Sequence, residues 1–349
     1  MNNEDQAFKI LEACDERREA RRAFLRYGSS AAILSGATLL SACGGGGGGD
    51  RGGNNDPISV PGPSPTPTPT PPTAALNDAD ILNFALQLEY LEAQFYAFAA
   101  SGTGLPDSIL GGTGRRGQVT GGKQVPFTDT LVAQYAREIA ADERAHVVFL
   151  RTALGAAATA QPTLDIGTGP NSAFSNAARA AGLVGPGVAF DAYANDENFL
   201  LGAFIFEDVG VTGYKGAAPL ITSKVFLEAA AGLLAVEAYH ASLIRTTLYG
   251  KGLATPSLRT ATERISDARD TLDNPIDDDQ GVQMIAARAV GGVSFGTMSN
   301  VVPTDANGLA YSRTPGDVLN IVYLTAAAAS QGGFFPDGVN GNIRLSTAG

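Results

Sequence analysis

The two histidines of this chain both stand three residues after a glutamate, in Glu143-x-x-His146 and Glu237-x-x-His240. Residues three apart on a helix lie on one face, so the two side chains of each pair can reach one metal ion. Both pairs have mainly apolar neighbours. A carboxylate or an imidazole buried in such a setting needs a partner, because unpaired burial is costly. The repeated pattern therefore predicts two inward-facing pairs of metal ligands on two helices.

Apolar residues recur at spacings of three and four from Asn77 onward, which predicts a helical protein. The predicted helices cover residues 77–101, 129–154, 195–214, 222–249, 256–272 and 315–330. Strand signals are sparse, and long glycine-rich connections are expected at residues 101–128, 156–189 and 275–314. Connections of that length often shape access to a site. The predicted fold class is all-α, a four-helix bundle with long loops and additional C-terminal helices.

The predicted helix before each Glu-x-x-His pair supplies another carboxylate, Glu89 in the first half and Glu207 in the second. Each is followed seven residues later by a tyrosine, Tyr96 or Tyr214, which places both side chains on one face. Tyr96 and Tyr214 are the predicted catalytic residues, as hydrogen-bond donors or redox-active neighbours of the site. The alternative is that they fill space in the core. The six predicted metal ligands are Glu89, Glu143, His146, Glu207, Glu237 and His240.

The charges of these six groups fit two metal ions. Four ionised glutamates carry four negative charges, which two divalent cations balance, whereas without metal the clustered carboxylates would repel one another and take up protons. Mixed carboxylate and imidazole ligation suits iron or manganese, and zinc also accepts it. We therefore expect a dinuclear iron or manganese centre.

Other acidic residues compete for a role in the site. Glu92 lies one turn from Glu89 and is its main rival, and Asp208 is a weaker rival of Glu207. The remaining acidic groups are predicted to be solvated: Glu138, Asp142, Glu228 and the run Asp277-Asp278-Asp279. Calcium binding is the alternative for that run, although it lacks the spacing of an EF-hand calcium loop.

The first 75 residues are interpreted as a signal and a tether. Residues 21–26 (RRAFLR) match a twin-arginine export signal, and a short apolar run leads to residues 40–43 (LSAC), which resemble the cleavage site of a lipoprotein. This predicts a signal peptide at 1–42, lipidation of Cys43 and export by the twin-arginine machinery. Residues 43–75 form a Gly/Pro-rich tether, and 76–349 form the folded domain.

Composition excludes several classes of protein. The net charge of −11 argues against nucleic-acid binding, since phosphate contacts need a surplus of Lys and Arg. Two cysteines do not support a disulfide scaffold. Residues 112–117 match GxGxxG, but the glycines and proline that follow do not continue as the helix that a dinucleotide site requires.

The six-residue pattern resembles the ferritin-like di-metal carboxylate superfamily. Residues 88–93 (LEYLEA), 207–214 (EDVGVTGY) and 312–315 (SRTP) are similar to segments of its desiccation-related members. The resemblance covers residues 76–340 and implies the bundle fold and the six ligands. It is much less specific for the reaction, since related centres oxidise iron, dismute peroxide or oxygenate substrates.

These observations predict a periplasmic or cell-surface protein, anchored to a membrane by lipid, whose metal site is redox-active towards O₂ or peroxide in oxidative or drying stress. One alternative is a structural or metal-sequestering centre in a stress-related or cell-surface protein without turnover. Another is an oxygenase of a small organic substrate, which would require an apolar access channel.

Overall fold

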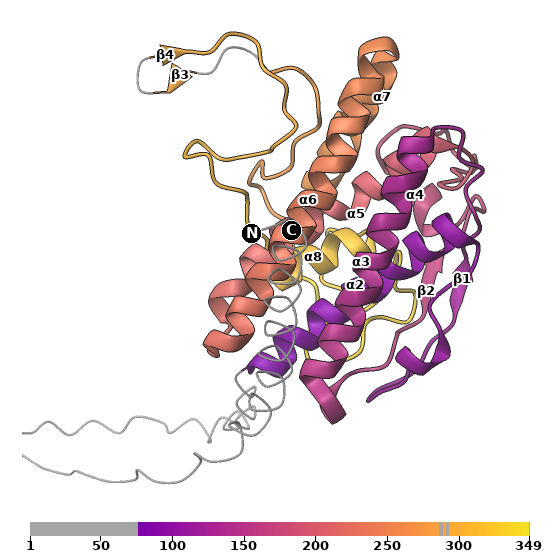
Figure 1. Cartoon of the computed structure of the whole chain (residues 1–349), viewed down its shortest axis with the longest axis vertical. Helices are drawn as coiled ribbons and strands as arrows, with labels where there is room; N and C mark the ends of the chain where they lie inside the picture. Colours follow the sequence, from indigo (N-terminus) through magenta and orange to yellow (C-terminus); the bar gives the residue numbers. More distant parts are fainter. Residues whose placement is uncertain (1–75, 286–288, 291–292, 349) are drawn as a thin grey trace, which may run out of the picture. The chain divides into compact units, whose positions relative to one another are not determined.

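The computed structural model describes residues 76–285, 289–290 and 293–348, and most of their regular structure is helical (Figure 1). The predicted signal peptide, the tether and Cys43 lie outside the described residues. Their roles and the predicted domain boundary stay predictions.

Four long helices form the body of the fold. They are α2 (Asp78–Ser101), α3 (Thr130–Leu154), α5 (Asp196–Ala217) and α6 (Lys224–Ala254). Helix α2 packs mainly on α3, and α5 packs mainly on α6, while smaller contacts join α2 to α5 and α3 to α6. Each pair corresponds to one half of the repeated ligand pattern. The all-α prediction is confirmed.

The ends of these helices follow from local signals. Asn77 and Asp80 form a capping box at the start of α2, and Gly102 ends that helix in the left-handed conformation at φ 77°. Asp129 caps α3 with its side chain. Helix α6 runs five residues beyond the predicted end, because Gly252 is buried against the side chain of Arg259 instead of ending the helix.

The connections contain more structure than the sequence predicts. One connection carries an additional helix, α4 (Ala173–Ala180). Strands β1 (Val119–Gly121) and β2 (Leu164–Ile166) pair in parallel with Val119 opposite Leu164, while β3 (Ala289–Val290) and β4 (Val293–Ser294) pair antiparallel. Short 3₁₀ turns lie at Asp107–Ile109, Gly155–Ala157 and Ala218–Leu220.

Two helices follow the bundle. Helix α7 (Pro256–Asp270) begins directly after α6, as predicted. Helix α8 (Pro315–Tyr323) has the predicted start but ends seven residues earlier than predicted, because Leu324 takes a left-handed conformation at φ 56°.

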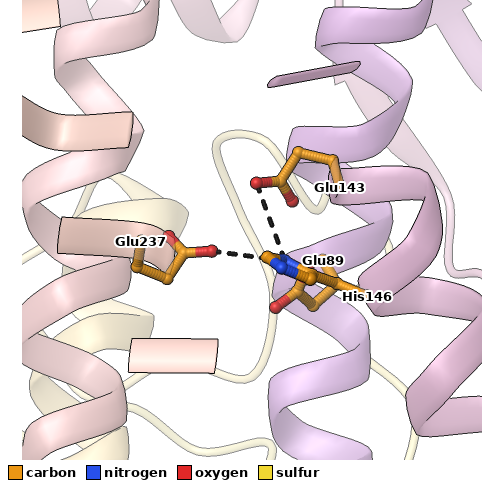
Figure 2. A group of neighbouring side chains, drawn as sticks. All are labelled: Glu89, Glu143, His146 and Glu237. Atoms are coloured by element: carbon orange, nitrogen blue, oxygen red, sulfur yellow. Dashed lines mark hydrogen bonds and ion pairs between the residues drawn. The ribbon is translucent and has the colours of Figure 1, made fainter. Parts of the chain in front are cut away.

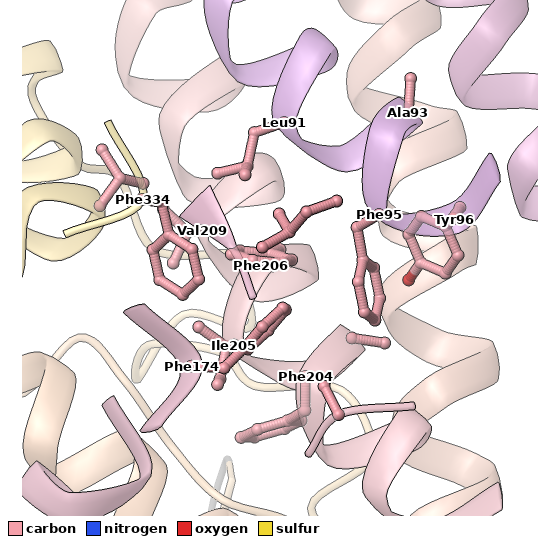
Figure 3. Close-up of a cluster of buried hydrophobic side chains, with 14 of the residues drawn as sticks. Leu91, Ala93, Phe95, Tyr96, Phe174, Phe204, Ile205, Phe206, Val209 and Phe334 are labelled. Atoms are coloured by element: carbon pink, nitrogen blue, oxygen red, sulfur yellow. The ribbon is translucent and has the colours of Figure 1, made fainter. Parts of the chain in front are cut away.

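An aromatic cluster lies beside the centre of the bundle (Figure 3). Phe95 of α2 contacts Phe199 and Phe206 of α5 at ring-centroid distances of 5.7 and 5.6 Å. Phe174 of α4 and Phe334 of the C-terminal segment join the same cluster. Buried aromatic clusters contribute strongly to stability. Through this one, helix α4 and the C-terminal segment are packed onto α2 and α5.

Helix α6 is long and apolar enough to cross a membrane by length and composition. In this fold it instead packs against α5 and α3 and carries Glu237 and His240 into the interior. About a third (33%) of its most apolar window is buried in the fold.

Candidate metal centre

The six predicted ligands converge from all four long helices. Glu89 lies on α2, Glu143 and His146 on α3, Glu207 on α5, and Glu237 and His240 on α6. None of the six is more than 6% exposed. The 3.6-residue period explains this placement, because each residue belongs to the inward stripe of its helix.

One histidine lies at the centre of a four-residue group (Figure 2). The Nδ1 atom of His146 is 3.1 Å from Oε2 of Glu89, 3.6 Å from Oε1 of Glu237 and 3.8 Å from Oε1 of Glu143. One ligand atom from each of these residues lies within 4.8 Å of all the others. The group therefore joins residues of three helices that could hold one metal ion.

The second histidine, His240, also has buried carboxylates beside its Nδ1 atom. The Nδ1 atom of His240 is 3.0 Å from Oε1 of Glu143 and 3.8 Å from Oε2 of Glu207. The two imidazole rings lie 6.0 Å apart, centroid to centroid. Glu143 is thus near both histidines, while Glu89 and Glu207 each lie near one histidine.

Several donor atoms of the site have no hydrogen-bond partner, which tests whether metal ions fit. Among the described residues, both carboxylate oxygens of Glu143 and of Glu237 accept no hydrogen bond, nor does Oε2 of Glu207, and Nδ1 of His240 has no hydrogen-bond partner. Leaving such groups unpaired in the interior is costly. Carboxylate and imidazole donors suit divalent transition metals. The residues present therefore fit a metal centre.

The pKa values of the buried carboxyl groups also favour cations in the site. Burial, together with neighbouring carboxylates, raises the pKa of Glu143 and of Glu237 well above the ordinary value. Burial raises the pKa of Glu207 from 4.5 to about 8, although the hydrogen bond from Tyr96 opposes the shift. Cations in the site would remove this repulsion.

Glu89 and His146 behave as an ion pair. Burial disfavours the charged form of Glu89, but the charge of His146 and its hydrogen bond outweigh burial and lower the pKa of Glu89. Burial likewise opposes the charge of His146, and Glu89 nevertheless raises the pKa of His146. Burial lowers the pKa of His240, which favours the neutral imidazole that binds metal.

The two tyrosines cross between the halves of the bundle. The hydroxyl of Tyr96 on α2 donates to Glu207 on α5, and the hydroxyl of Tyr214 on α5 donates to Glu89 on α2. Burial and the adjacent carboxylates raise the pKa of both phenols well above the ordinary value. Among the predicted roles, the structure thus favours that of hydrogen-bond donor. Each tyrosine donates to the glutamate of the other helix, not to the glutamate seven residues before it.

The two rivals of the predicted ligands have no recorded contact with either histidine. Glu92 is buried, but none of the described hydrogen bonds or ion pairs joins it to a histidine. Asp208 pairs instead with Arg245 at 2.7 Å and with Arg269 at 3.2 Å. The geometry favours Glu89 and Glu207, whose role as ligands stays a prediction.

One contact of the site is missing from the sequence prediction. Asp142, expected to be solvated, is half exposed, and its Oδ2 lies 3.3 Å from Nε2 of His240. A carboxylate on the outer nitrogen of a metal-ligating histidine holds the orientation of its ring. The only sequence signal is that Asp142 directly precedes Glu143, and the corresponding position before Glu237 is Val236.

The predicted solvated acidic run at 277–279 is a second correction. Only Asp277 is exposed, whereas Asp278 and Asp279 are 4% and 5% exposed. Both pair with Nη2 of the buried Arg313, at 2.6 and 3.0 Å. Oxygens of Asp270, Asp273 and Asp278 lie within 4.8 Å of one another, but Arg313 already binds two of these residues.

Comparisons with known proteins agree with this geometry. Residues 77–250 match the model of the ferritin-like domain. The chain is 32% identical to a ferritin-like catalase of Nesocodon mauritianus over 271 residues, which cover 76% of this chain and 84% of that protein. It is 33% identical to a desiccation-related protein of Craterostigma plantagineum over 274 residues, which cover 76% and 83% of the two chains. No solved structure matches significantly. The chain belongs to the ferritin-like domain family.

Proposed function

We propose that this chain is an exported ferritin-like protein whose dinuclear iron or manganese site reacts with peroxide or O₂ in oxidative or drying stress. The observation that carries the proposal is the convergence of four glutamates and two histidines with unpartnered buried donor atoms. A relative described as a ferritin-like catalase supports peroxide as the oxidant.

Bound ions would supply Lewis acidity and reversible electron transfer. The protein's own part is positioning. Glu143 lies between the two histidines, where its carboxylate can serve both ions. Tyr96 and Tyr214 hold the outer carboxylates of Glu207 and Glu89 through their hydroxyl groups. The shell of buried apolar residues excludes bulk water.

The location of the protein is part of the proposal. The twin-arginine pattern at 21–26 and the lipoprotein-like segment at 40–43 support export and attachment through Cys43. Twin-arginine export suits a protein that folds and takes up its metal before transport. Labelling with a radioactive or clickable fatty acid tests this, and unchanged labelling of a Cys43→Ala variant would rule out the anchor.

Elemental analysis combined with an oxidant assay tests the metal site. We expect two iron or manganese ions per chain, with both ions weakened or lost in Glu237→Ala and His240→Ala. The matched control is Glu228→Ala, which removes an exposed glutamate of the same helix. Stopped-flow absorbance should show metal-dependent consumption of H₂O₂ or O₂. A loaded protein that consumes neither oxidant removes the redox proposal.

A second candidate function is a structural or metal-storing centre without turnover. The unpartnered buried donors favour it equally, since ions would stabilise the core whatever their reactivity. The relative described as a desiccation-related protein is compatible with it. It predicts that Glu143→Ala lowers the melting temperature while the wild-type protein shows no turnover, and robust wild-type turnover would contradict it.

A further inference from the structure

Glu92 is a buried carboxyl group that the six-ligand pattern leaves unused. It lies one turn after Glu89 on α2 and is 6% exposed. No hydrogen bond or ion pair joins it to another of the described residues. Its carboxylate oxygens are not among the unpartnered atoms that are fully shielded from water, so a small molecule can reach them. The six-ligand pattern does not explain why a carboxyl group lies here.

The position of Glu92 breaks the symmetry between the two halves of the bundle. The residue three after Glu207 on α5 is Gly210, where α2 has Glu92. A Cβ atom at Gly210 would collide with the carboxylate of Glu237 and would lie 3.6 Å from Oε1 of Glu92. Gly210 thus provides the room in which the end of Glu92 lies beside the metal centre.

Glu92 also lines an apolar pocket between α2 and α5. Half-exposed Ala85 and Leu88 contribute to its wall on α2, and Tyr214 and Ala217 contribute from α5. Glu92 is the one charged side chain among the described residues that line it. The space open to the centre of a water-sized molecule measures about 20 Å³. About 10–15 Å³ of such space holds one water, so the pocket has room for one very small molecule.

We propose that this pocket is the entrance through which hydrogen peroxide reaches the metal centre, and that the carboxyl group of Glu92 holds it there by a hydrogen bond. The proposal deepens and rests on the proposed redox function. It is a binding step and involves no covalent change.

The chemistry of the pocket selects this occupant. Apolar walls do not replace the hydration shell of an ion, so a hydrated metal ion or a charged substrate is disfavoured there. Hydrogen peroxide is uncharged and has two O–H donors, for which a carboxyl group offers acceptor oxygens in either protonation state. Molecular oxygen has no donor to use this group. The small volume also excludes organic hydroperoxides, so we expect selection by size.

Kinetics of the metal-loaded full chain test the role of Glu92. Replacement by a similarly sized apolar residue, Glu92→Leu, should raise KM for H₂O₂ about tenfold with kcat less affected, which is the range expected for one lost hydrogen bond to a carboxyl group. Glu92→Gln retains an acceptor oxygen and should raise KM less. Metal content is measured for each variant. An unchanged KM in a fully loaded Glu92→Leu protein overturns this role.

Pocket size is tested separately. Ala85→Leu fills the entrance and should lower kcat/KM for H₂O₂ about tenfold, whereas Ala100→Leu, at a partly exposed alanine of the same helix outside the pocket, is the matched control. The wild-type protein should discriminate strongly against tert-butyl hydroperoxide, and Leu88→Ala should reduce that discrimination. Equal use of both peroxides by the wild-type protein contradicts the proposal.

Binding of nitric oxide to the reduced iron-loaded protein gives a readout that needs no turnover. Nitric oxide is small and uncharged, and its association changes the absorbance of ferrous iron. Ala85→Leu should slow association, and Ala100→Leu should not. A wild-type protein that binds nitric oxide but consumes no peroxide would remove the proposed function, while the variant rates would still decide whether the pocket is the entrance.

The metal content of the wild-type protein gives a further outcome. A folded wild-type chain that takes up no metal overturns the entrance, because the pocket would then lead to no reactive centre.

Discussion

The residues around the two histidines differ in how they are held. Nδ1 of each histidine lies beside a carboxylate, Glu89 at 3.1 Å from His146 and Glu143 at 3.0 Å from His240. On the outer side, Nε2 of His240 also has Asp142 at 3.3 Å, and the described ion pairs of His146 involve only its Nδ1. A carboxylate on the outer nitrogen holds the orientation of the ring. The two histidines therefore have similar inner contacts and different outer ones.

Asp142→Ala should weaken metal binding at the His240 side by about 10–100-fold, because the ring loses the carboxylate that orients it. The control is Glu138→Ala, which removes an exposed carboxylate one turn earlier on α3. Competition with a chromophoric chelator measures the affinities. Equal affinities in the two variants would show that Asp142 does not orient the ring.

At the scale of the element, helix α5 joins the metal centre to the segment after α7. Glu207 lies beside His240, while its neighbour Asp208 pairs with Arg245 and Arg269. One turn later, Thr212 accepts a hydrogen bond from Nη1 of Arg313 at 3.0 Å. Gly216 lets the backbone of Arg313 approach, because a Cβ there would collide with it. Helix α5 thus carries a predicted metal ligand and residues that pack against the segment around Arg313.

Arg313→Met should destabilise the fold by about 3–5 kcal/mol, because it leaves buried carboxylates without their cation. The comparison is Arg115→Met, which removes an exposed pair with Asp337 and should cost about 1 kcal/mol or less. Chemical denaturation of both variants measures the difference. Similar losses in the two proteins would contradict the assigned role of Arg313.

At the scale of the whole folded domain, the long connections return to the four helices that build the site. The buried Arg245 of α6 binds backbone carbonyls of Gln280 and Asn300 at 2.8 and 2.6 Å. Near the C-terminus, the backbone N–H of Asn340 donates to the side chain of Gln87 on α2. The connections around residues 280, 300 and 340, for which the sequence predicts no helix, are therefore hydrogen-bonded to polar side chains of the bundle helices.

Stability of the metal-free protein should fall as the pH rises from about 5 to about 8. Glu207 has a pKa of about 8 in the folded chain and 4.5 as its ordinary value, so in this interval the folded state retains a proton that the unfolded state loses. Burial also raises the pKa of Glu143 and of Glu237, so both carboxyl groups contribute to the same loss of stability with rising pH.

Metal binding reverses this trend, because the ligands bind as deprotonated groups. The rise in melting temperature on adding metal should therefore be larger near pH 8 than near pH 5. Calorimetry of chelator-treated and reloaded protein measures both quantities. A metal-free melting temperature that rises with pH over this interval would contradict the assignment of these carboxyl groups.

The helices and the inward-facing residues were predictable, because they depend on residues that are close together in the sequence. The Glu-x-x-His spacing placed four ligands on helix faces, and Asn77 and Gly102 marked the ends of α2, since periodicity and capping depend on neighbours in the chain. The six residues that converge are those that the pattern indicated. The extent of α6 and α8 was less predictable, because packing against Arg259 and the left-handed Leu324 decide where they end.

The sequence by itself determined which face of each long helix points into the bundle, because the direction of a side chain follows from its position in the helical turn. Tertiary structure alone decided which groups meet across helices. It brought Tyr96 to Glu207 and Tyr214 to Glu89, buried Asp278 beside Arg313, and left Glu92 at the end of an apolar pocket. These pairings join positions up to 125 residues apart, and their energy depends on burial and charge that exist only once the helices have packed.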